Sequence, residues 1–157
     1  MRLLLINGAS GSGKTTLAQA LSDRIESLLW IHPDGLMDTP DMTAEEILER
    51  SLSGIDKEHR GGSIVIDCQI RPGSIAALVP PRLQNAWAMV LLHAPREIRE
   101  QRLSQRGWSA EDFERIERWA ALLVEESQDA GWPIFDTSVR SVESLVTGLE
   151  EKLSEDL

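Results

Sequence analysis

A glycine-rich run near the start of the chain carries the clearest chemical signal. Residues 8–15 read Gly-Ala-Ser-Gly-Ser-Gly-Lys-Thr and match the pattern Gly-x-x-x-x-Gly-Lys-Thr. Glycines permit backbone turns that bring N–H groups against phosphate oxygens. Lys14 adds a mobile positive charge for the β- and γ-phosphates, and the Thr15 hydroxyl is a suitable ligand for Mg²⁺. The run therefore predicts a site for ATP and Mg²⁺.

The residues on either side of this run, which we call the P-loop, have the pattern that such a site requires. Residues 3–6 are continuously apolar, as in a strand buried on both faces. Leu17, Leu21 and Ile25 then recur at helical spacing. A helix that begins after the glycines points its positive amino end at the phosphates. We expect the nucleotide to be bound by Gly8, Ala9, Ser10, Gly11, Ser12, Gly13, Lys14, Thr15 and Thr16.

The rest of the chain alternates short apolar runs with longer amphipathic ones. Strands are predicted at residues 28–32, 63–67, 86–93 and 133–136. Helices are predicted to begin near Thr43, Ser74, Pro95, Ser109 and Ser141, and the one that begins near Pro95 runs to about Arg106. This alternation predicts an α/β fold in three layers, with a five-stranded parallel sheet between helices. Ligands of such sheets bind beyond the carboxyl ends of the strands, so residues there are the functional candidates.

Composition limits the classes of protein and partner. A length of 157 residues favours one domain over residues 1–157, and a net charge of −10 disfavours nucleic acid and anionic membranes as partners. The longest apolar run, residues 86–92, is too short to span a membrane. Cys68 is the one cysteine, which excludes an internal disulfide and fits a reducing compartment, so we expect the cytoplasm. The sequence leaves the oligomeric state open.

The positions of the lysines limit the class of nucleotide-binding protein to which the chain can belong. A guanine-specific GTPase needs an Asn/Thr-Lys-x-Asp element for the base, and neither Lys57 nor Lys152 stands in one. Large mechanical ATPases need a longer chain. Over nearly its whole length the sequence resembles the small P-loop kinases, which include adenylate-kinase-like enzymes, gluconate and shikimate kinases, and chloramphenicol phosphotransferase. The resemblance implies transfer of the γ-phosphoryl group of ATP to a small-molecule acceptor, at a hydroxyl group.

Two aspartates after the second predicted strand are candidates for the acceptor side. The segment from Asp34 to Pro40, with Asp38 inside it, resembles the corresponding segment of chloramphenicol phosphotransferase. That resemblance implies that Asp34 is the base for the acceptor hydroxyl. We expect Asp38 to bind the acceptor too, and the sequence leaves open which of the two acts as base. A carboxylate near the γ-phosphate can accept the hydroxyl proton and direct the oxygen in line. The alternative is a turn-forming Asp-Gly pair.

The third predicted strand ends in Asp67, which is typical of an aspartate that holds Mg²⁺ through water. Arg71 follows at the spacing of the arginine that binds an acceptor phosphate in nucleotide kinases. The residues between them differ from that family's pattern. Arg71 therefore has three interpretations: a contact to an acceptor phosphate, a contact to another polar acceptor group, or a surface ion pair.

An arginine-rich helix near residue 100 resembles the helix that leads into the lid of these kinases. Arg102 and Arg106 are four residues apart and share a helical face, so we expect both to act on the transferring phosphoryl group from a short lid at about residues 102–112. We expect Arg96 and Arg99 instead to pair on the helix surface with Glu97 and Glu100.

Aromatic residues and the last strand supply weaker candidates. Asp136-Thr137-Ser138 resembles the segment that flanks adenine in gluconate-kinase-like proteins. Trp108 could cover an acceptor or adenine, and Trp119 could line an acceptor pocket, but packing in the core is the favoured interpretation of both. Two alternatives to a hydroxyl kinase stay open: a nucleoside or nucleotide kinase with a phosphorylated acceptor, and a non-catalytic ATP-binding regulator.

Overall fold

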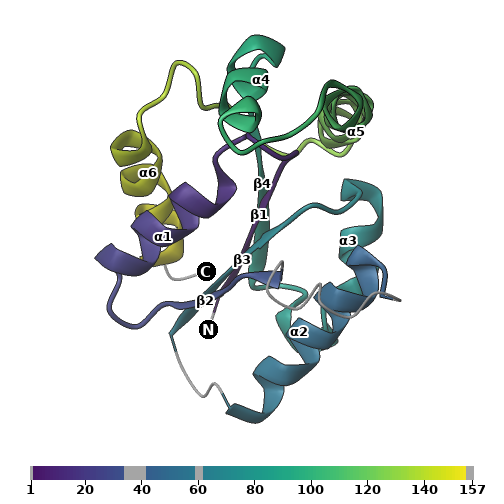
Figure 1. Cartoon of the computed structure of the whole chain (residues 1–157). Coiled ribbons are helices and arrows are strands. Elements are labelled where there is room, and N and C mark those ends of the chain that lie inside the picture. Colours follow the sequence, from purple (N-terminus) through teal and green to yellow (C-terminus); the bar gives the residue numbers. More distant parts are fainter. Residues whose placement is uncertain (1, 34–41, 59–61, 155–157) are drawn as a thin grey trace.

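The computed structural model describes residues 2–33, 42–58 and 62–154, whose strands form one parallel sheet. The strands are β1 (Arg2–Asn7), β2 (Leu29–Ile31), β3 (Ser63–Cys68), β4 (Trp87–His93) and β5 (Ile134–Asp136). Their order across the sheet is β2-β3-β1-β4-β5, so β1 lies at the centre (Figure 1). All five predicted strands are present, and the α/β class is confirmed.

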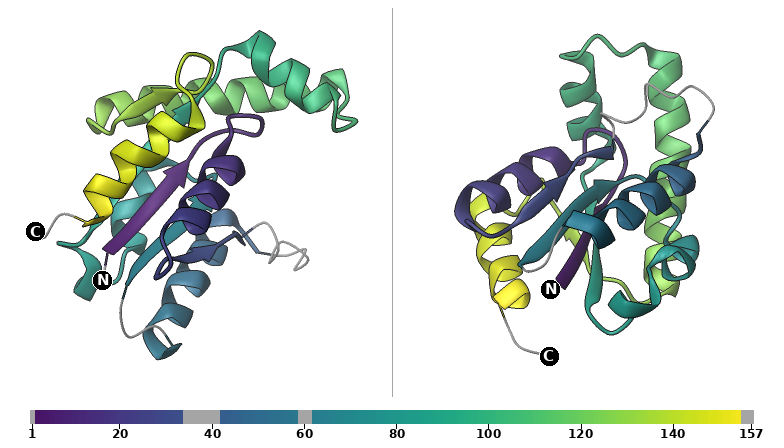
Figure 2. Two further views of the ribbon diagram at one scale, coloured as in Figure 1. Left: turned by 90° about the vertical axis from the view of Figure 1, so that its left-hand side faces the viewer. Right: turned by 90° about the horizontal axis from the view of Figure 1, so that it is seen from below.

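Helices cover both faces of this sheet (Figures 1 and 2). One face is covered by α1 (Lys14–Arg24) and α6 (Val142–Ser154), which pack against each other. The opposite face is covered by α2 (Ala44–Glu58), α3 (Pro72–Leu78) and α5 (Ala110–Asp129). The short helices η2 (Pro81–Leu83) and α4 (Arg96–Ser104) precede and follow β4. No helix in the described part of the chain is both long enough and apolar enough to cross a membrane.

The side chains of β1 alternate between the two faces of the sheet, and both faces are buried. This explains why the sequence of β1 is apolar without interruption. Leu3 and Leu5 pack into the core under α2 and α3, whereas Leu4 and Ile6 pack into the core under α1 and α6. Successive side chains of a strand point to opposite faces, and here both faces are buried. Polar loop residues can therefore follow such a central strand only beyond its end, outside the buried part of the sheet.

Side chains cap the helices where the sequence predicts. Thr43 and Glu46 form a reciprocal capping box, with Thr43 N donating to Glu46 Oε2 at 2.7 Å and Glu46 N to Thr43 Oγ1 at 3.2 Å. Ser109 Oγ accepts from Asp112 N at 3.2 Å, and Ser141 Oγ accepts from Ser144 N at 3.2 Å. These predicted helix starts are confirmed.

The link between α4 and α5 is short. The helix predicted to begin near Pro95 ends at Ser104, two residues before the predicted end at about Arg106. Gly107 then takes a left-handed conformation with φ of 80°, and Trp108 N donates to Leu103 O at 3.2 Å to close the turn. The segment from 105 to 109 therefore leaves no room for a separate lid domain.

The predicted pairing of Arg96 and Arg99 along their own helix is wrong. Arg96 pairs with Glu114 and Arg99 with Glu117, both on the neighbouring helix α5. Arg99 is only 2% exposed, and its Nε donates to Ala94 O at 2.9 Å. A buried guanidinium needs a partner that can reach it, and α5 supplies one because it packs beside α4.

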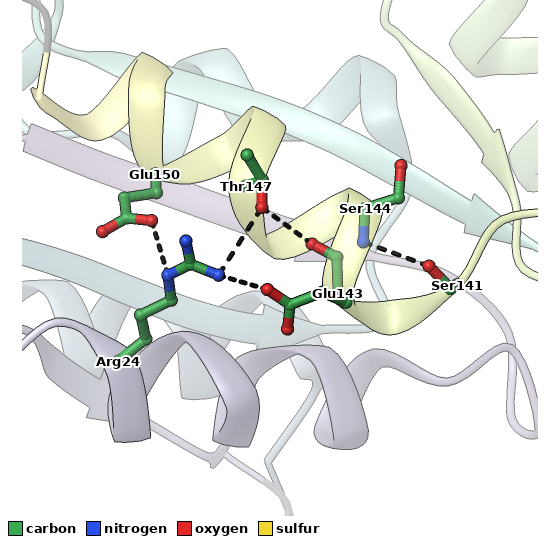
Figure 3. A network of polar contacts seen from close by, with 6 residues as sticks. All are labelled: Arg24, Ser141, Glu143, Ser144, Thr147 and Glu150. Atoms are coloured by element: carbon green, nitrogen blue, oxygen red, sulfur yellow. Dashed lines mark hydrogen bonds and ion pairs between the residues drawn. The ribbon is translucent and has the colours of Figure 1, made fainter.

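An exposed ion-pair network joins α1 to α6 (Figure 3). Arg24 Nη1 lies 2.6 Å from Glu143 Oε1, and Arg24 Nε lies 2.7 Å from Glu150 Oε2. Exposed pairs of this kind stabilise a fold weakly. The network adds to the apolar packing that holds α6 against the helix that follows the P-loop.

Two glycines test whether space or backbone conformation limits substitution. Both Gly148, in the exposed interior of α6, and Gly107 have no described atom within 4 Å of an added Cβ. Gly148→Ala should raise the free energy of unfolding by about 1 kcal/mol, because alanine favours a helix. Gly107→Ala should lower it by roughly 1 kcal/mol, since its φ is left-handed. Urea unfolding measures the free energy of unfolding of both variants. Equal changes in the two variants would contradict the left-handed conformation assigned to Gly107.

Candidate active site

The P-loop joins β1 to α1 at the carboxyl edge of the sheet. An added Cβ at Gly8 would lie 2.5 Å from Leu92 O on β4 and 2.6 Å from Ser12 Oγ. No side chain fits at that point without moving backbone. Glycine at the first position therefore lets the loop turn tightly against the neighbouring strand.

Asn7 anchors the start of the loop, a role that the sequence analysis missed. It is fully buried, and its Oδ1 accepts from Gly8 N at 2.9 Å and from Ile70 N at 3.1 Å. Its Nδ2 donates to Ile70 O at 2.7 Å. One amide thus ties the P-loop to the segment after β3. The sequence feature that could have identified Asn7 was its polar side chain at the end of an apolar strand.

The amino end of α1 is left open for an anion. Gly13 caps the helix with a left-handed φ of 99° and no side chain, and the first turn holds no acidic residue. In contrast, α2, α5 and α6 each have acidic residues in the first turn. Free N–H groups and the helix dipole favour phosphate at such an end. Lys14 Nζ lies 3.3 Å from Ala9 O and so places its charge over the same loop.

Thr15 and Asp67 lie together, as the sequence predicts for a metal site. Thr15 Oγ1 donates to Asp67 Oδ2 at 3.1 Å, and Asp67 is 2% exposed. A hydroxyl and a carboxylate are hard oxygen donors of the kind that Mg²⁺ prefers. Across the described ranges, no group of three or more His, Cys, Asp or Glu side chains could hold a metal ion. The Thr15 hydroxyl and the Asp67 carboxylate are two such donors side by side, so their chemistry fits Mg²⁺.

Two side chains from the edge strand orient Asp67. Trp30 Nε1 donates to Asp67 Oδ1 at 2.9 Å, and His32 Nδ1 lies 2.8 Å from Asp67 Oδ2. Both residues come from β2 or its end, which pairs with β3 in parallel. The sequence analysis missed them because their contact depends on strand order. Their spacing of two residues, which puts them on one face of a strand, was the only local signal.

Arg102 and Thr137 bind the outer side of the P-loop. Arg102 Nη1 donates to Gly11 O at 2.8 Å and to Thr137 Oγ1 at 3.2 Å. Thr137 Oγ1 in turn donates to Ser12 O at 2.9 Å. Two loop carbonyls, Gly11 O and Ser12 O, are thus held from the outer side of the loop. The following turn is fixed by Ser138, whose hydroxyl and backbone N–H bonds lower the pKa of the Asp136 carboxyl.

A cavity of about 190 Å³ lies beside this contact, and Arg102 and Arg106 both border it. The structure therefore brings together the two arginines predicted for the lid. Its other described lining residues are Gly11, Gly13, Thr16, Leu17, Leu92, Thr137, Arg140, Val142 and Leu145. Its contact with the P-loop glycines fits the nucleotide side of the site.

A larger cavity of about 480 Å³ touches the P-loop at Ser10. The described residues that line it are Ser10, Pro33, Ala44, Ile47, Leu48, Cys68, Gln69, Ile70, Trp108, Ile116 and Trp119. Gly11 and Gly13 border the smaller cavity, whereas Ser10 borders this one. The P-loop thus borders both cavities.

Arg71 does not border either cavity. It pairs with Glu126 on α5, and its side chain is 54% exposed. The Arg71 hydrogen bond and charge lower the pKa of the Glu126 carboxyl. This geometry is that of the surface ion pair, one of the three interpretations offered by the sequence. Asp34 and Asp38 lie outside the described residues, so their roles stay predictions.

Comparisons with known proteins give the same fold. A family model described as "AAA domain" matches residues 4–122. A sugar kinase from Janibacter sp. HTCC2649 is 21% identical with a TM-score of 0.66, and the alignment covers 98% of this chain and 96% of that one. Shikimate kinase from Acinetobacter baumannii is 12% identical with a TM-score of 0.68, covering 97% and 92%.

A gluconokinase from Sinorhizobium meliloti is 15% identical with a TM-score of 0.64, covering 97% and 93%. At these identities the structural similarity shows a shared fold. No curated protein matches the sequence.

The contact at Thr137 predicts a change in nucleotide affinity. Thr137→Val keeps the side-chain shape but removes the hydrogen bonds of Thr137 Oγ1 with Ser12 O and with Arg102 Nη1, so Ser12 O loses this donor and Arg102 loses one acceptor. We expect the dissociation constant for ATP, measured by calorimetry, to rise about 5- to 10-fold. Thr147→Val is the matched control, because Thr147 Oγ1 contacts Arg24 and Glu143 O in the exposed network between α1 and α6. Equal affinities in both variants would contradict the proposed contact.

The Arg71–Glu126 pair predicts a pH-dependent stability. The folded-state pKa of Glu126 is lowered, so the pair stabilises the fold above the usual glutamate pKa of about 4.3 and loses that effect as pH falls through the folded value. Arg71→Gln should therefore lower the urea midpoint slightly at pH 7 and by less at pH 3.5. The effect is small because Arg71 is exposed. A loss that is equal at both pH values would argue against this pairing.

Proposed function

The chain belongs to the AAA domain family, and we propose that it transfers the γ-phosphoryl group of ATP to a hydroxyl group of a small-molecule acceptor. Residues 1–157 act as one kinase domain in this proposal, with residues 102–112 as a short lid. The solved structures that share the fold include kinases of sugar, shikimate and gluconate type.

One observation carries the proposal: the P-loop borders two separate cavities. A nucleotide-dependent switch needs only the first cavity, beside the glycines and α6. A phosphotransferase needs a second cavity at the phosphate end, where an acceptor can lie in line with the γ-phosphate. The cavity at Ser10 supplies that space.

The residues of the loop act on ATP mainly by position and charge. The N–H groups of the P-loop and the open end of α1 bind phosphate oxygens, and Lys14 binds the β- and γ-phosphates. Thr15 and Asp67 would hold Mg²⁺, with Asp67 kept in place by Trp30 and His32. When bound, Mg²⁺ neutralises charge on the phosphate oxygens.

The transfer forms one bond and breaks another. The acceptor oxygen bonds to the γ-phosphorus, the bond from that phosphorus to the β,γ-bridging oxygen breaks, and ADP leaves. The hydroxyl proton passes to a carboxylate, for which we propose Asp34, with Asp38 as a further acceptor contact. Arg102 positions the loop, and Arg106 closes over the phosphates and excludes water, which would otherwise react.

The test is ATP turnover with Mg²⁺, alone and with fractions of hydroxylated metabolites, nucleosides and nucleotides. We expect one class of acceptor to stimulate ADP release, and Lys14→Ala to lower the stimulated rate at least about 100-fold because it removes a charge at the transferring group. Urea unfolding checks that this variant folds. Tight ATP binding without stimulation by any fraction would refute the kinase and support the regulatory alternative.

A further inference from the structure

Two arginines of α5 border a groove that adjoins the cavity at Ser10, and we call it the α5 groove. It has a volume of about 470 Å³, and its described lining residues are Gln69, Arg115, Ile116, Arg118, Trp119 and Leu122. Three of these, Gln69, Ile116 and Trp119, also line the cavity at Ser10. A molecule long enough to fill both spaces therefore reaches from the P-loop to the two guanidinium groups.

The arginines of the α5 groove are available to an anion. Three acidic residues of α5 pair with arginines of other elements: Glu114 with Arg96, Glu117 with Arg99, and Glu126 with Arg71. One turn along the helix from the exposed Arg118 lie Glu114, Arg115, Ala121 and Leu122, and the carboxylate among them is the one that pairs with Arg96. Arg115 pairs with Asp112 at 3.2 Å, an exposed contact that contributes little. The like charges of Arg115 and Arg118 share a helical face, so an anion between them relieves their repulsion.

The cavity between the P-loop and these arginines has mostly apolar walls. Its volume of about 480 Å³ lies in the range of small-molecule sites. Ala44, Ile47, Leu48, Ile70 and Ile116 are among the side chains that line it. Apolar surface of a ligand is withdrawn from water there, which favours an apolar body. At the P-loop end, Ser10 Oγ donates to Gln69 Oε1 at 3.4 Å, so polar groups lie where the phosphoryl group is transferred in the proposed reaction.

The proposed reaction places negative charge at the P-loop end of the acceptor. The γ-phosphate is anionic, and the proposed base, Asp34, follows Pro33, which lines the cavity at Ser10. The described lining residues of the α5 groove do not include Pro33. An anionic group on the acceptor is repelled by the γ-phosphate and attracted by the arginines. The hydroxyl and an anionic group of one acceptor therefore belong at opposite ends of the site.

We propose that the acceptor carries an anionic group, a carboxylate or a phosphate, at the end of an apolar body opposite to its hydroxyl. The anionic group binds Arg115 and Arg118, whose planar guanidinium groups match the oxygens of either anion. The body packs in the cavity beside Ile116 and Trp119, and the hydroxyl lies beside Ser10. This inference rests on the proposed function, because that hydroxyl receives the phosphoryl group.

Binding is measured with two fluorescent probes that share one aromatic body. 8-Anilinonaphthalene-1-sulfonate carries an anionic sulfonate, whereas N-phenyl-1-naphthylamine is uncharged, and saturating Mg·ADP keeps both out of the nucleotide side. We expect the sulfonate probe to bind about 5- to 10-fold more tightly, and Arg118→Gln to remove most of this difference with the Kd of the uncharged probe within about twofold. NaCl at about 0.5 M should also reduce the difference, because salt screens exposed charges.

Turnover is measured with acceptors that share a benzyl alcohol body and differ in charge. These are 4-(hydroxymethyl)benzoate, its uncharged amide, 4-(aminomethyl)benzyl alcohol and 4-(hydroxymethyl)benzyl phosphate, and naphthalene versions of each test a longer body. We expect kcat/KM for the carboxylate or the phosphate to exceed that of the amide about 10-fold through a lower KM, and the double variant Arg115→Gln, Arg118→Gln to remove most of the difference.

Arg2→Gln is the matched control for the arginine variants. Arg2 borders another apolar cavity, at the amino ends of β1 and β4, and its substitution changes the net charge of the protein by the same amount as Arg118→Gln. We expect Arg2→Gln to leave the preference for the sulfonate probe and for the anionic acceptors in place. Urea unfolding checks that every variant folds.

The outcomes separate this inference from the proposed function. A preference for the sulfonate probe that depends on Arg118, with no turnover of these acceptors or of the metabolite fractions, supports the anion site and refutes the kinase. Higher turnover with the amide or the amine than with either anion overturns the inference and keeps the kinase. Equal affinity for the two probes, binding of neither probe, or a preference that depends on Arg2 instead of Arg118 also overturns it.

Discussion

The buried carboxylate of Asp67 is the constraint around which the site is arranged. A carboxylate withdrawn from water costs several kcal/mol unless donors surround it. Here Thr15 comes from α1, and Trp30 and His32 come from the edge strand β2 or its end. These contacts fix three elements relative to one another at the carboxyl edge of the sheet. The hydroxyl of Thr15, which the proposed mechanism needs, is oriented by the same contact.

The P-loop is held from two sides by different means. Asn7 ties its start to the segment after β3, and Arg102 with Thr137 binds its carbonyls from the side of α4 and β5. Contacts of this kind hold a loop in one conformation before a ligand binds, which is the condition for electrostatic preorganisation. The two cavities border different residues of this segment, Ser10 for one and Gly11 with Gly13 for the other, so nucleotide and acceptor need not compete for space in the proposed mechanism.

Much of the fold follows from local patterns. The apolar runs, the glycine-rich turn and the capping residues Thr43, Ser109 and Ser141 act within a few residues of their own position, so the sequence predicts them well. The prediction that Arg99 pairs along its own helix was wrong because its partner, Glu117, lies on another helix. Trp30, His32 and Asn7 were missed for the same reason: each acts on a residue that is distant along the chain.

The sequence by itself determined the P-loop, the order of strands and helices along the chain, and the aspartate at the end of β3, because each depends on residue type at fixed local spacing. Only the tertiary structure decided the strand order β2-β3-β1-β4-β5, and with it the neighbours of Asp67. It also decided that Arg71 pairs with Glu126 and that two tryptophans line a cavity at Ser10. Such contacts depend on how elements pack, and packing is set by the sum of many apolar contacts that no local pattern contains.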